Sequence, residues 1–351
     1  MDDALFIRRC FQLAQLGAAS VSPNPMVGAV LVHAGKIIGE GWHQKFGQAH
    51  AEVHCIQSAT AENQPLIADA TLYCNLEPCA HFGKTPPCSD LILTHKIRRV
   101  VVSNMDPNPL VAGKGLEKLS KAGVDVKAGV LEAEGRWLNR SFFTWITLNR
   151  PRIILKWAQS ADGFIGTEGE RTSISGPAAR RLVHQWRAQC DAILVGTQTA
   201  RVDNPRLDVR HFYGKNPLRI SFDLNGVIPR SHYLLDDSTE TWIYGAERSL
   251  PESIPGKGAR FERTRFISGK QNILIPEVLV ALKKDHRASL LVEGGANLLT
   301  QFLEGNYWDE IRVLENKHRL GKGVIAPKIP VNIPLRDEFT VGDDLVRIFA
   351  P

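Results

Sequence analysis

The sequence predicts an α/β protein of two domains, and three observations support this class. Apolar runs of strand length, such as 27–33 and 289–292, alternate along the chain with segments of helical apolar spacing, such as 3–19. Strands that alternate with helices form a sheet layer covered by helices. The 351 residues are enough for two hydrophobic cores. We expect the first domain over 1–148 and the second over 149–351.

The composition limits the class of protein. Apolar residues make up 43% and charged residues 23% of the chain, as in ordinary globular proteins. No run of 18 apolar residues occurs, so we expect no membrane-spanning helix. Met1–Ala4 carries acids where a signal peptide needs bases, and we expect a cytoplasmic location. The net charge of +6 fits phosphorylated ligands, and no polybasic tract indicates nucleic acid.

The first half is expected to open with a helix over 3–19, capped by Asp2 or Asp3 and ended by Ser22–Pro25. The apolar runs 27–33 and 37–42, joined by a Gly-containing turn, predict a hairpin. The other expected elements are a helix from His50 to Ile56, strands over 70–74, 97–103 and 124–126, a helix over 116–122, and an amphipathic helix over 132–148. We expect this last helix to join the domains, its aromatic face packed between them; a partner-binding helix is the alternative.

The second half is expected to open with a strand interrupted by Lys156, which is either at the strand's end or placed in a pocket. This strand covers 152–158. The other expected elements are a helix over 177–189, a strand over 191–196, a polar loop over 197–210, a strand over 218–223, short strands and loops over 224–286 with a helix over 278–284, a strand over 289–292, and a helix to 303. Gly294-Gly295 precedes that last helix and would let a phosphate approach its N–H groups. No G-x-G-x-x-G occurs, so a Rossmann fingerprint is absent.

One set of residues indicates a catalytic metal. His50, Cys79 and Cys88 supply an imidazole and two thiolates, the ligands of a zinc site with an open fourth position. Glu52 stands where zinc deaminases have their acid/base, and would pass a proton from the activated water to the ring nitrogen and the leaving ammonia. Pro78 is expected to begin a helical turn whose N–H groups favour the Cys79 thiolate. A structural zinc or no metal at all is the alternative.

The spacing of the two cysteines leads to a resemblance. Eight residues separate Cys79 from Cys88, where the common deaminase signature has two. The stretch L-E-P-C-A-H-F-G-K-T-P-P-C strongly resembles the deaminase half of the RibD family, the bifunctional enzymes of bacterial riboflavin biosynthesis. P-N-P-x-V-G-x-V-x-V, from Pro23, matches the same family. The resemblance implies a three-layer cytidine-deaminase-like domain, in which the loop between the cysteines shapes a pocket for a phosphoribosyl pyrimidine.

The same resemblance implies that Asn24 faces the substrate, although an Asn between two prolines fits plain turn chemistry equally well. Asp106–Pro109 is another rigid loop similar to the family, and we assign it no role. His43 and His54 are expected to be structural residues.

The second half resembles the reductase half of the same family. The matching stretches are L-K-W-A-Q-S-A-D-G from Leu155, G-T-Q-T-A-R-V-D-N-P-R-L-D-V-R from Gly196, and V-E-G-G-A-N-L from Val292. The resemblance therefore covers about residues 1–315. It implies a dihydrofolate-reductase-like α/β fold and an NADPH-dependent reduction of a ribosyl group to a ribityl group.

Site residues are carried over by position. The resemblance implies that the nucleotide is bordered by Ala158, Ser173, Thr199 and Asp203, with its phosphates at Gly295, Ala296 and Asn297. It implies a substrate site formed by Lys156, Arg171, Arg187, Leu207, Arg210 and Glu293, in which the arginines suit a phosphate. The chain departs from the family pattern at Arg171, Ser173, Leu224 and 314–321.

We therefore expect a homo-oligomeric enzyme with one Zn²⁺ per chain and NADPH, and with no nucleic-acid or membrane partner. It would deaminate diaminohydroxyphosphoribosylaminopyrimidine and then reduce 5-amino-6-(5-phosphoribosylamino)uracil, with Lys156 or bound water as proton donor. One alternative is a nucleoside or nucleic-acid deaminase with an appended nucleotide-binding domain. Others are a metal-stabilised binding protein, and an active deaminase joined to a weakened reductase.

Overall fold

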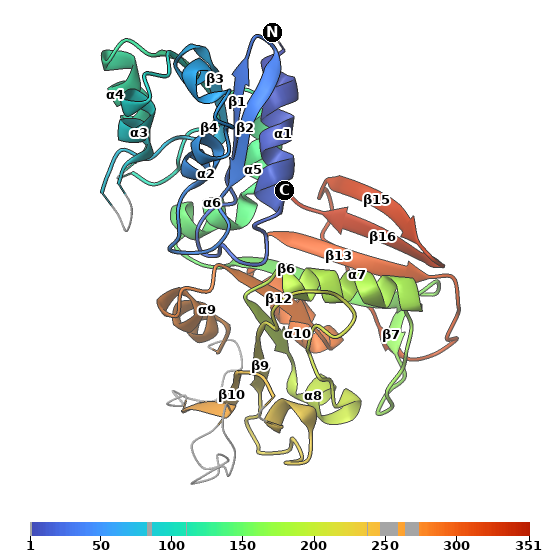
Figure 1. Ribbon diagram of the computed structural model, residues 1–351. Coiled ribbons are helices and arrows are strands. Elements are labelled where there is room, and N and C mark those ends of the chain that lie inside the picture. Colours follow the sequence, from blue (N-terminus) through green and yellow to red (C-terminus); the bar gives the residue numbers. More distant parts are fainter. Residues whose placement is uncertain (1, 83–85, 110, 237, 246–258, 264–273) are drawn as a thin grey trace. The chain divides into compact units, whose positions relative to one another are not determined.

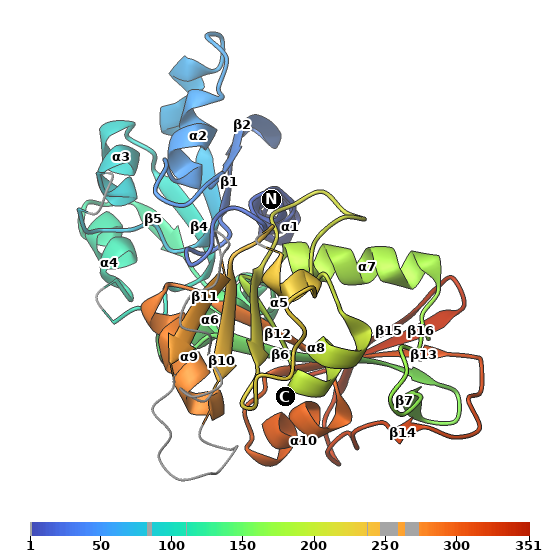
Figure 2. The ribbon, with the colours of Figure 1, turned by 90° about the horizontal axis from the view of Figure 1, so that it is seen from below.

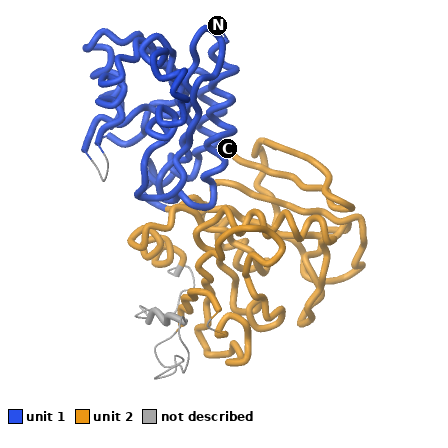
Figure 3. The backbone as a smooth tube through the Cα atoms, in the orientation of Figure 1, with its two compact units in different colours: residues 1–150 blue, residues 151–351 orange. Residues whose placement is uncertain are grey.

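Two separate sheets, each with its own helices, divide the chain into units of residues 1–150 and 151–351 (Figures 1 and 3). The structure is a computed structural model that describes residues 2–82, 86–109, 111–236, 238–245, 259–263 and 274–351. Within these residues, no helix combines the length and apolar character needed to cross a membrane.

The first unit is built on a sheet in the order β2-β1-β3-β4-β5. Its strands are β1 (Gly28–His33), β2 (Lys36–Trp42), β3 (Thr71–Leu76), β4 (Arg99–Asn104) and β5 (Asp125–Lys127). β1 runs antiparallel to both β2 and β3, whereas β3, β4 and β5 are parallel. The predicted hairpin is confirmed, and Ala34 and Gly35 both adopt positive φ in its turn, as a two-residue hairpin turn requires.

Alternating side chains give this sheet two covered faces. The helices are α1 (Asp3–Gln15), α2 (Ala51–Gln57), α3 (Cys88–Thr94), α4 (Lys114–Lys121), α5 (Glu132–Leu138) and α6 (Arg140–Thr147), with a 3-10 turn η1 (Gln64–Asp69). Val30 and Tyr73 face α1, whereas Leu31 and Leu72 belong to the core under α2, α3 and α4. The expected three-layer α/β/α domain is confirmed, with α1 on one side of the sheet and α2 on the other (Figure 1).

The second unit contains a larger mixed sheet in the order β11-β10-β9-β8-β12-β6-β13-β16-β15 among the described residues. Its strands are β6 (Arg152–Ser160), β8 (Ala192–Val195), β9 (Leu218–Phe222), β10 (Thr241–Gly245), β11 (Ala259–Arg263), β12 (Ser289–Glu293), β13 (Glu310–Asn316), β15 (Leu335–Val341) and β16 (Asp344–Phe349), with β7 (Phe164–Gly166) and β14 (Val324–Ile325) paired apart from it. From β11 to β13 the neighbours are parallel; β16 and β15 close the sheet antiparallel.

Helices cover both faces of this sheet, as parallel strands require. They are α7 (Pro177–Ala188), α8 (Thr197–Asp203), α9 (Leu274–Lys284) and α10 (Ala296–Glu304), with a 3-10 turn η2 (Tyr233–Leu235). Leu155 and Val292 lie in the core with α9 and α10, whereas Ile154 and Leu291 face the side that carries α8. α7 and α10 lie on opposite sides of the sheet (Figure 2).

Three local expectations were wrong. The helix expected over 132–148 is two helices, which break at Asn139, where a buried side chain leaves the helix to bond the backbone of Met26. The polar loop expected over 197–210 begins as helix α8; its one fully buried residue, Ala200, gives almost no apolar periodicity. Pro78 begins no helix, and Pro87 instead precedes α3.

Phe142 and Phe143 of α6 pack against Leu76 of β3, so this aromatic face belongs to the core of the first unit. The sequence analysis also missed α3 and the antiparallel strands β15 and β16. Part of the expected strand-and-loop region 224–286 lies outside the described residues.

A buried carboxylate on α1 predicts an acid-dependent stability. Asp3 accepts hydrogen bonds from Tyr73, Arg99 and Lys127. Burial raises the pKa of Asp3, but these donors outweigh it and lower the pKa from 3.8 to about 2. The stabilisation is therefore fully present above pH 3.8 and is lost as the pH falls towards 2.

We expect Asp3→Asn to lower the free energy of unfolding by about 2 kcal/mol at pH 7, because one pKa unit corresponds to about 1.4 kcal/mol and Lys127 is solvent-exposed. The difference from the parent chain should shrink below pH 4 in urea unfolding. Asp125→Asn removes another carboxylate that pairs with Arg99, but a 71% exposed one, and should change stability little. An equal effect of the two substitutions would contradict the assignment.

Candidate active sites of the two units

Three segments of the first unit bring the predicted metal ligands together. His50 is the N-cap of α2, Cys79 follows β3 in an irregular loop, and Cys88 is the first residue of α3. His50 Nδ1 lies 3.3 Å from Cys88 Sγ and 3.5 Å from Cys79 Sγ. The donor atoms of all three residues lie within 4.8 Å of one another.

This geometry fits zinc. A tetrahedral ion with ordinary Zn–N and Zn–S bonds places its nitrogen and sulfur ligands roughly 3.6 Å apart, close to both separations here. Among the described residues, the metal-ligand cluster consists of these three side chains. Three protein ligands leave the fourth position for water or substrate, which is the arrangement of a catalytic zinc site.

Local hydrogen bonds prepare the thiol of Cys79 for metal binding. Hydrogen bonds from Cys88 and His50 lower the pKa of Cys79 to about 4, although burial opposes this shift. The pKa of Cys88 is raised because its thiol donates to Cys79 and is buried. The backbone N–H of Cys88 also donates to Cys79 Sγ, at 3.4 Å. A coordinating thiol loses its proton outright, so a bound ion would remove this asymmetry.

Glu52 lies in the first turn of α2 and is 3% exposed. Burial raises the pKa of Glu52, while the nearby His50 opposes the shift. A carboxyl group whose pKa is raised towards neutrality can both accept and release a proton, which is the property that a general acid/base needs. The position beside the ligands and the environment of Glu52 both suit that role.

Asn24 and His43 form a hydrogen-bonded pair next to the ligands. His43 Nδ1 lies 3.0 Å from the carbonyl oxygen of Ala49, so this nitrogen carries the proton. His43 Nε2 must then accept from Asn24 Nδ2, at 3.2 Å. The ring of His43 meets that of His50 edge-on, with centroids 5.7 Å apart. This contact could not be predicted from the sequence, because Asn24 and His43 are 19 residues apart along the chain.

Two buried amides hold the segment that carries Asn24. Asn139 accepts from the N–H of Met26 at 2.8 Å and donates to its carbonyl at 2.9 Å. Asn75 donates to the same carbonyl and accepts from the N–H of Gly28. Of the loop between the two cysteines, His81 is exposed, and residues 83–85 lie outside the described residues.

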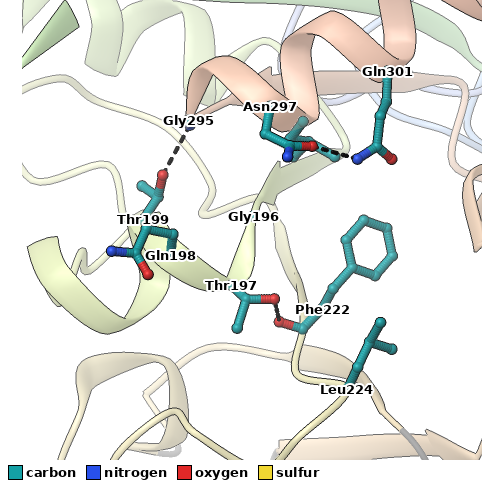
Figure 4. Close-up of a pocket in the computed structure, with 10 residues that line it drawn as sticks. Gly196, Thr197, Gln198, Thr199, Phe222, Leu224, Gly295, Asn297 and Gln301 are labelled. Carbon is teal, nitrogen blue, oxygen red and sulfur yellow. Dashed lines mark hydrogen bonds between the residues drawn. The ribbon is translucent and has the colours of Figure 1, made fainter. Parts of the chain in front are cut away.

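The second unit has a cavity of about 230 Å³ at the carboxyl ends of β8, β9 and β12 (Figure 4). The residues that line it are Gly196, Thr197, Gln198, Thr199, Phe222, Leu224, Gly295, Asn297, Leu298 and Gln301. The crevice beyond the carboxyl ends of parallel strands is the usual ligand site of such sheets. Three predicted cofactor residues therefore line one cavity: Thr199, Gly295 and Asn297.

A hydrogen bond joins the start of α10 to α8. Thr199 Oγ1 accepts from the N–H of Gly295 at 2.8 Å, as the dashed line in Figure 4 shows. Gly294 has φ +157°, and a Cβ atom there would lie 3.3 Å from Thr199 Oγ1, so the glycines permit the close approach of α8.

The other predicted cofactor residues do not line this cavity. Ala158 packs on β6 beside Leu314, and Ser173 Oγ accepts from Arg180 at 3.2 Å. Burial raises the pKa of Asp203, and the nearby Arg171 opposes that shift. Ala296 is the first residue of α10 and is also absent from the lining.

Predicted substrate residues meet around one buried carboxylate. Arg187 donates to both oxygens of Glu293, at 2.8 and 2.9 Å, and Lys156 Nζ lies 3.6 Å from Glu293 Oε2. Burial raises the pKa of Glu293, but Arg187 and Lys156 outweigh it and lower the pKa to about 2. Burial lowers the pKa of Lys156, and Glu293 opposes this shift.

The neighbouring segment adds Arg210 and a histidine that the sequence analysis missed. Arg210 pairs with Asp208, and its backbone N–H donates to His184 Nδ1 at 3.3 Å. Burial and the nearby arginines lower the pKa of His184 to about 4. Leu207 adopts a positive φ of 52° and places its side chain in the core.

Known families match both halves of the chain. The family model described as the RibD C-terminal domain matches residues 151–329. The model described as the cytidine and deoxycytidylate deaminase zinc-binding region matches residues 1–104.

Relatives match nearly the whole chain. The riboflavin biosynthesis protein RibD of Aquifex aeolicus is 39% identical over 358 residues, covering 99% of this chain and 98% of that protein. RibD of Escherichia coli is 36% identical over 347 residues, covering 94% and 89%.

Two solved structures share the fold over both units. One is the diaminohydroxyphosphoribosylaminopyrimidine deaminase/5-amino-6-(5-phosphoribosylamino)uracil reductase of Thermotoga maritima, with a TM-score of 0.88, 32% identity, and coverage of 99% of this chain and 98% of that one. The other is Acinetobacter baumannii RibD, with a TM-score of 0.84, 31% identity and the same coverage.

The ion cluster at Glu293 predicts a large effect on stability. Glu293→Gln removes the anion that compensates two buried cations, and we expect it to lower the free energy of unfolding by about 3–5 kcal/mol. Glu315→Gln removes a partly exposed carboxylate that pairs with Arg347 in the same sheet, and should cost at most about 1 kcal/mol. Urea unfolding of both variants measures the contrast, and similar midpoints would refute it.

Proposed function

This chain belongs to the RibD family of bifunctional riboflavin-biosynthesis enzymes, and from that premise we propose which of its residues carry each reaction. It is a zinc-dependent diaminohydroxyphosphoribosylaminopyrimidine deaminase and an NADPH-dependent 5-amino-6-(5-phosphoribosylamino)uracil reductase. We assign deamination to residues 1–148 and reduction to residues 149–351. The observation that carries the assignment is the converging His50, Cys79 and Cys88 donors in a chain that matches the family over both halves.

In the first unit, His50, Cys79 and Cys88 would hold zinc. Zinc held there would lower the pKa of a coordinated water and so supply a hydroxide near neutral pH. Glu52 would take one proton of the attacking water and deliver it to the ring nitrogen, and would then carry the second proton from the new hydroxyl group to the departing amino group, which leaves as ammonia. Asn24 faces the substrate with its amide oriented by His43, whose tautomer is fixed by Ala49.

In the second unit, Thr199, Gly295 and Asn297 would position NADPH, which supplies the hydride. The family resemblance alone supports four further residues of the proposed nucleotide site: Ala158, Ser173, Asp203 and Ala296. This hydride would go to the sugar carbon, and a proton would have to reach the sugar oxygen. Lys156 is suited to donate it, because burial lowers the pKa of Lys156 and so favours proton release.

The proposed substrate site also includes Arg171, Arg187, Leu207, Arg210 and Glu293. All three guanidinium nitrogens of Arg187 already contact Glu293 or the carbonyl oxygen of Asp208. We therefore propose that Arg210 binds the substrate phosphate and that Arg187 holds Glu293 in place. A cytoplasmic location, a homo-oligomeric assembly and the lack of a nucleic-acid partner remain proposals from the sequence.

A nucleoside or nucleic-acid deaminase with an appended domain is disfavoured because the second half matches a reductase family over 151–329. A coupled assay tests the choice directly. The zinc-loaded enzyme receives the diaminopyrimidine ribosyl phosphate, and ammonia release and NADPH consumption are followed together. Both signals are expected, and a chelator should abolish the first. Ammonia release without NADPH consumption would leave only the deaminase, as expected of a weakened reductase.

Glu52→Gln should separate catalysis from metal binding. We expect deamination to fall at least about a hundredfold, since the proton carrier is lost, while zinc remains bound because Glu52 is not a ligand. His50→Ala serves as the control that should lose zinc as well as activity. Metal analysis and reductase activity of the same samples complete the measurement. Full deaminase activity in the Glu52 variant would exclude Glu52 as the proton carrier.

Lys156→Met keeps most of the length of the side chain but removes its ammonium group. We expect the kcat of reduction to fall about a hundredfold, the usual size of a general-acid contribution, with deamination unaffected. Lys317→Met removes an exposed lysine that pairs with Asp343 and should leave both activities unchanged. An unchanged reduction rate in the Lys156 variant would exclude Lys156 as donor and assign the proton to bound water.

A further inference from the structure

One buried carboxylate of the first unit holds a segment of backbone rather than a metal or a cation. Glu77 is 4% exposed and stands two residues before Cys79. Its oxygens accept four backbone N–H groups, from Asp106 at 3.2 Å, Gly113 at 2.9 Å, Gly115 at 2.9 Å and Leu116 at 3.4 Å. These donors belong to residue 106 and to residues 113–116, and we name the described residues 106–109 and 111–116 the clamped segment.

The clamped segment lies directly against the strand end that carries the zinc ligand. The N–H of Glu77 donates to the carbonyl oxygen of Asn104 at 2.9 Å, which joins the ends of β3 and β4. A Cβ atom on Gly115 would lie 1.9 Å from the carbonyl oxygen of Pro78, so only glycine permits this approach. The Glu77 carboxylate and the Gly115 contact thus fix the segment beside Cys79.

Backbone N–H dipoles compensate the negative charge of Glu77. Among the described residues, its hydrogen-bond partners are N–H groups, and two of them belong to the first turn of α4. The start of a helix carries partial positive charge, which favours a carboxylate there. A carboxylate can accept from all four donors at once, whereas an amide would turn its own N–H groups towards some of them.

The clamped segment also carries a second carboxyl group, that of the half-buried Asp106. Burial raises the pKa of Asp106 to about 6; Glu77 and Cys79 add to the shift, and His81 opposes it. Its side chain accepts from the N–H of Asn108 at 2.8 Å, which closes a local turn. Any shift of the segment would move this group relative to the ligands.

We propose that Glu77 is a positioning residue for deamination, which holds the described residues 106–109 and 111–113 as a wall of the pocket beside the zinc cradle. This proposal rests on the deaminase function assigned to the first unit. Glu77 touches neither metal nor substrate; it acts through the wall that it holds. A displaced wall weakens substrate binding more than it slows the chemical step, because the ligands and Glu52 stay in place.

Glu77→Gln tests the proposal, since Gln has the same shape but puts donor groups against the N–H cluster. We expect the KM of deamination to rise about tenfold or more, the effect of one lost charge-assisted hydrogen bond, with kcat within about threefold. Zinc content should remain one ion per chain. Glu117→Gln is the matched control: Glu117 is an exposed carboxylate in the first turn of the same helix, paired with Lys121, and should change neither parameter.

A second activity and a second variant separate a local effect on deamination from a general loss of structure. Reductase activity of the same chains reports the integrity of the second unit and should not change. Glu77→Asp replaces the Gln variant if that variant folds poorly. It retains the charge but shortens the side chain, and it should also raise the KM of deamination while zinc is retained. An unchanged KM in both variants, or loss of zinc from both, would overturn the proposal. Absence of ammonia release by the parent enzyme would instead overturn the assigned deaminase function.

Discussion

The first unit is organised by the need to bring three donor atoms from distant segments within 4.8 Å of one another. His50 and Cys88 stand at the starts of helices, and Cys79 stands beyond the end of a fully buried strand. α2 packs closely on β2 because Gly41 has no side chain. A Cβ atom on Gly41 would lie 2.3 Å from the backbone nitrogen of Cys55. Coordination geometry therefore constrains packing far beyond the ligands themselves.

The second unit meets a different constraint, because its parallel strands bury charged side chains at their carboxyl ends. Glu293 ends β12, and its neighbour on β6 is Lys156. Arg187 of α7 stabilises this buried pair, because it donates hydrogen bonds to both oxygens of Glu293. The same edge of the sheet carries the cavity lined by Thr199 and Gly295, so strand ends supply both the charged cluster and this cavity.

The sequence was most informative where one local pattern decides the structure. The hairpin of β1 and β2 and the Gly-Gly junction before α10 were predicted correctly from short stretches. The predicted ligands His50, Cys79 and Cys88 lie within reach of one metal ion. It failed where distant partners decide. α8 buries too little to show periodicity, Asn139 breaks a helix in favour of Met26, and the pairing of His43 with Asn24 exists only once the sheet has formed.

The two units put the same residue type to opposite uses. Glu52 and Glu293 are both buried, and burial raises the pKa of each. At Glu52 the opposing charge of His50 does not prevail, so the pKa stays above its ordinary value. At Glu293 two cations prevail and the pKa falls to about 2, so the group stays ionised at neutral pH. Its fixed charge can hold Lys156 and Arg187 in place. We therefore infer that neighbouring cations, rather than burial alone, decide the direction of the pKa shift at these two carboxyl groups.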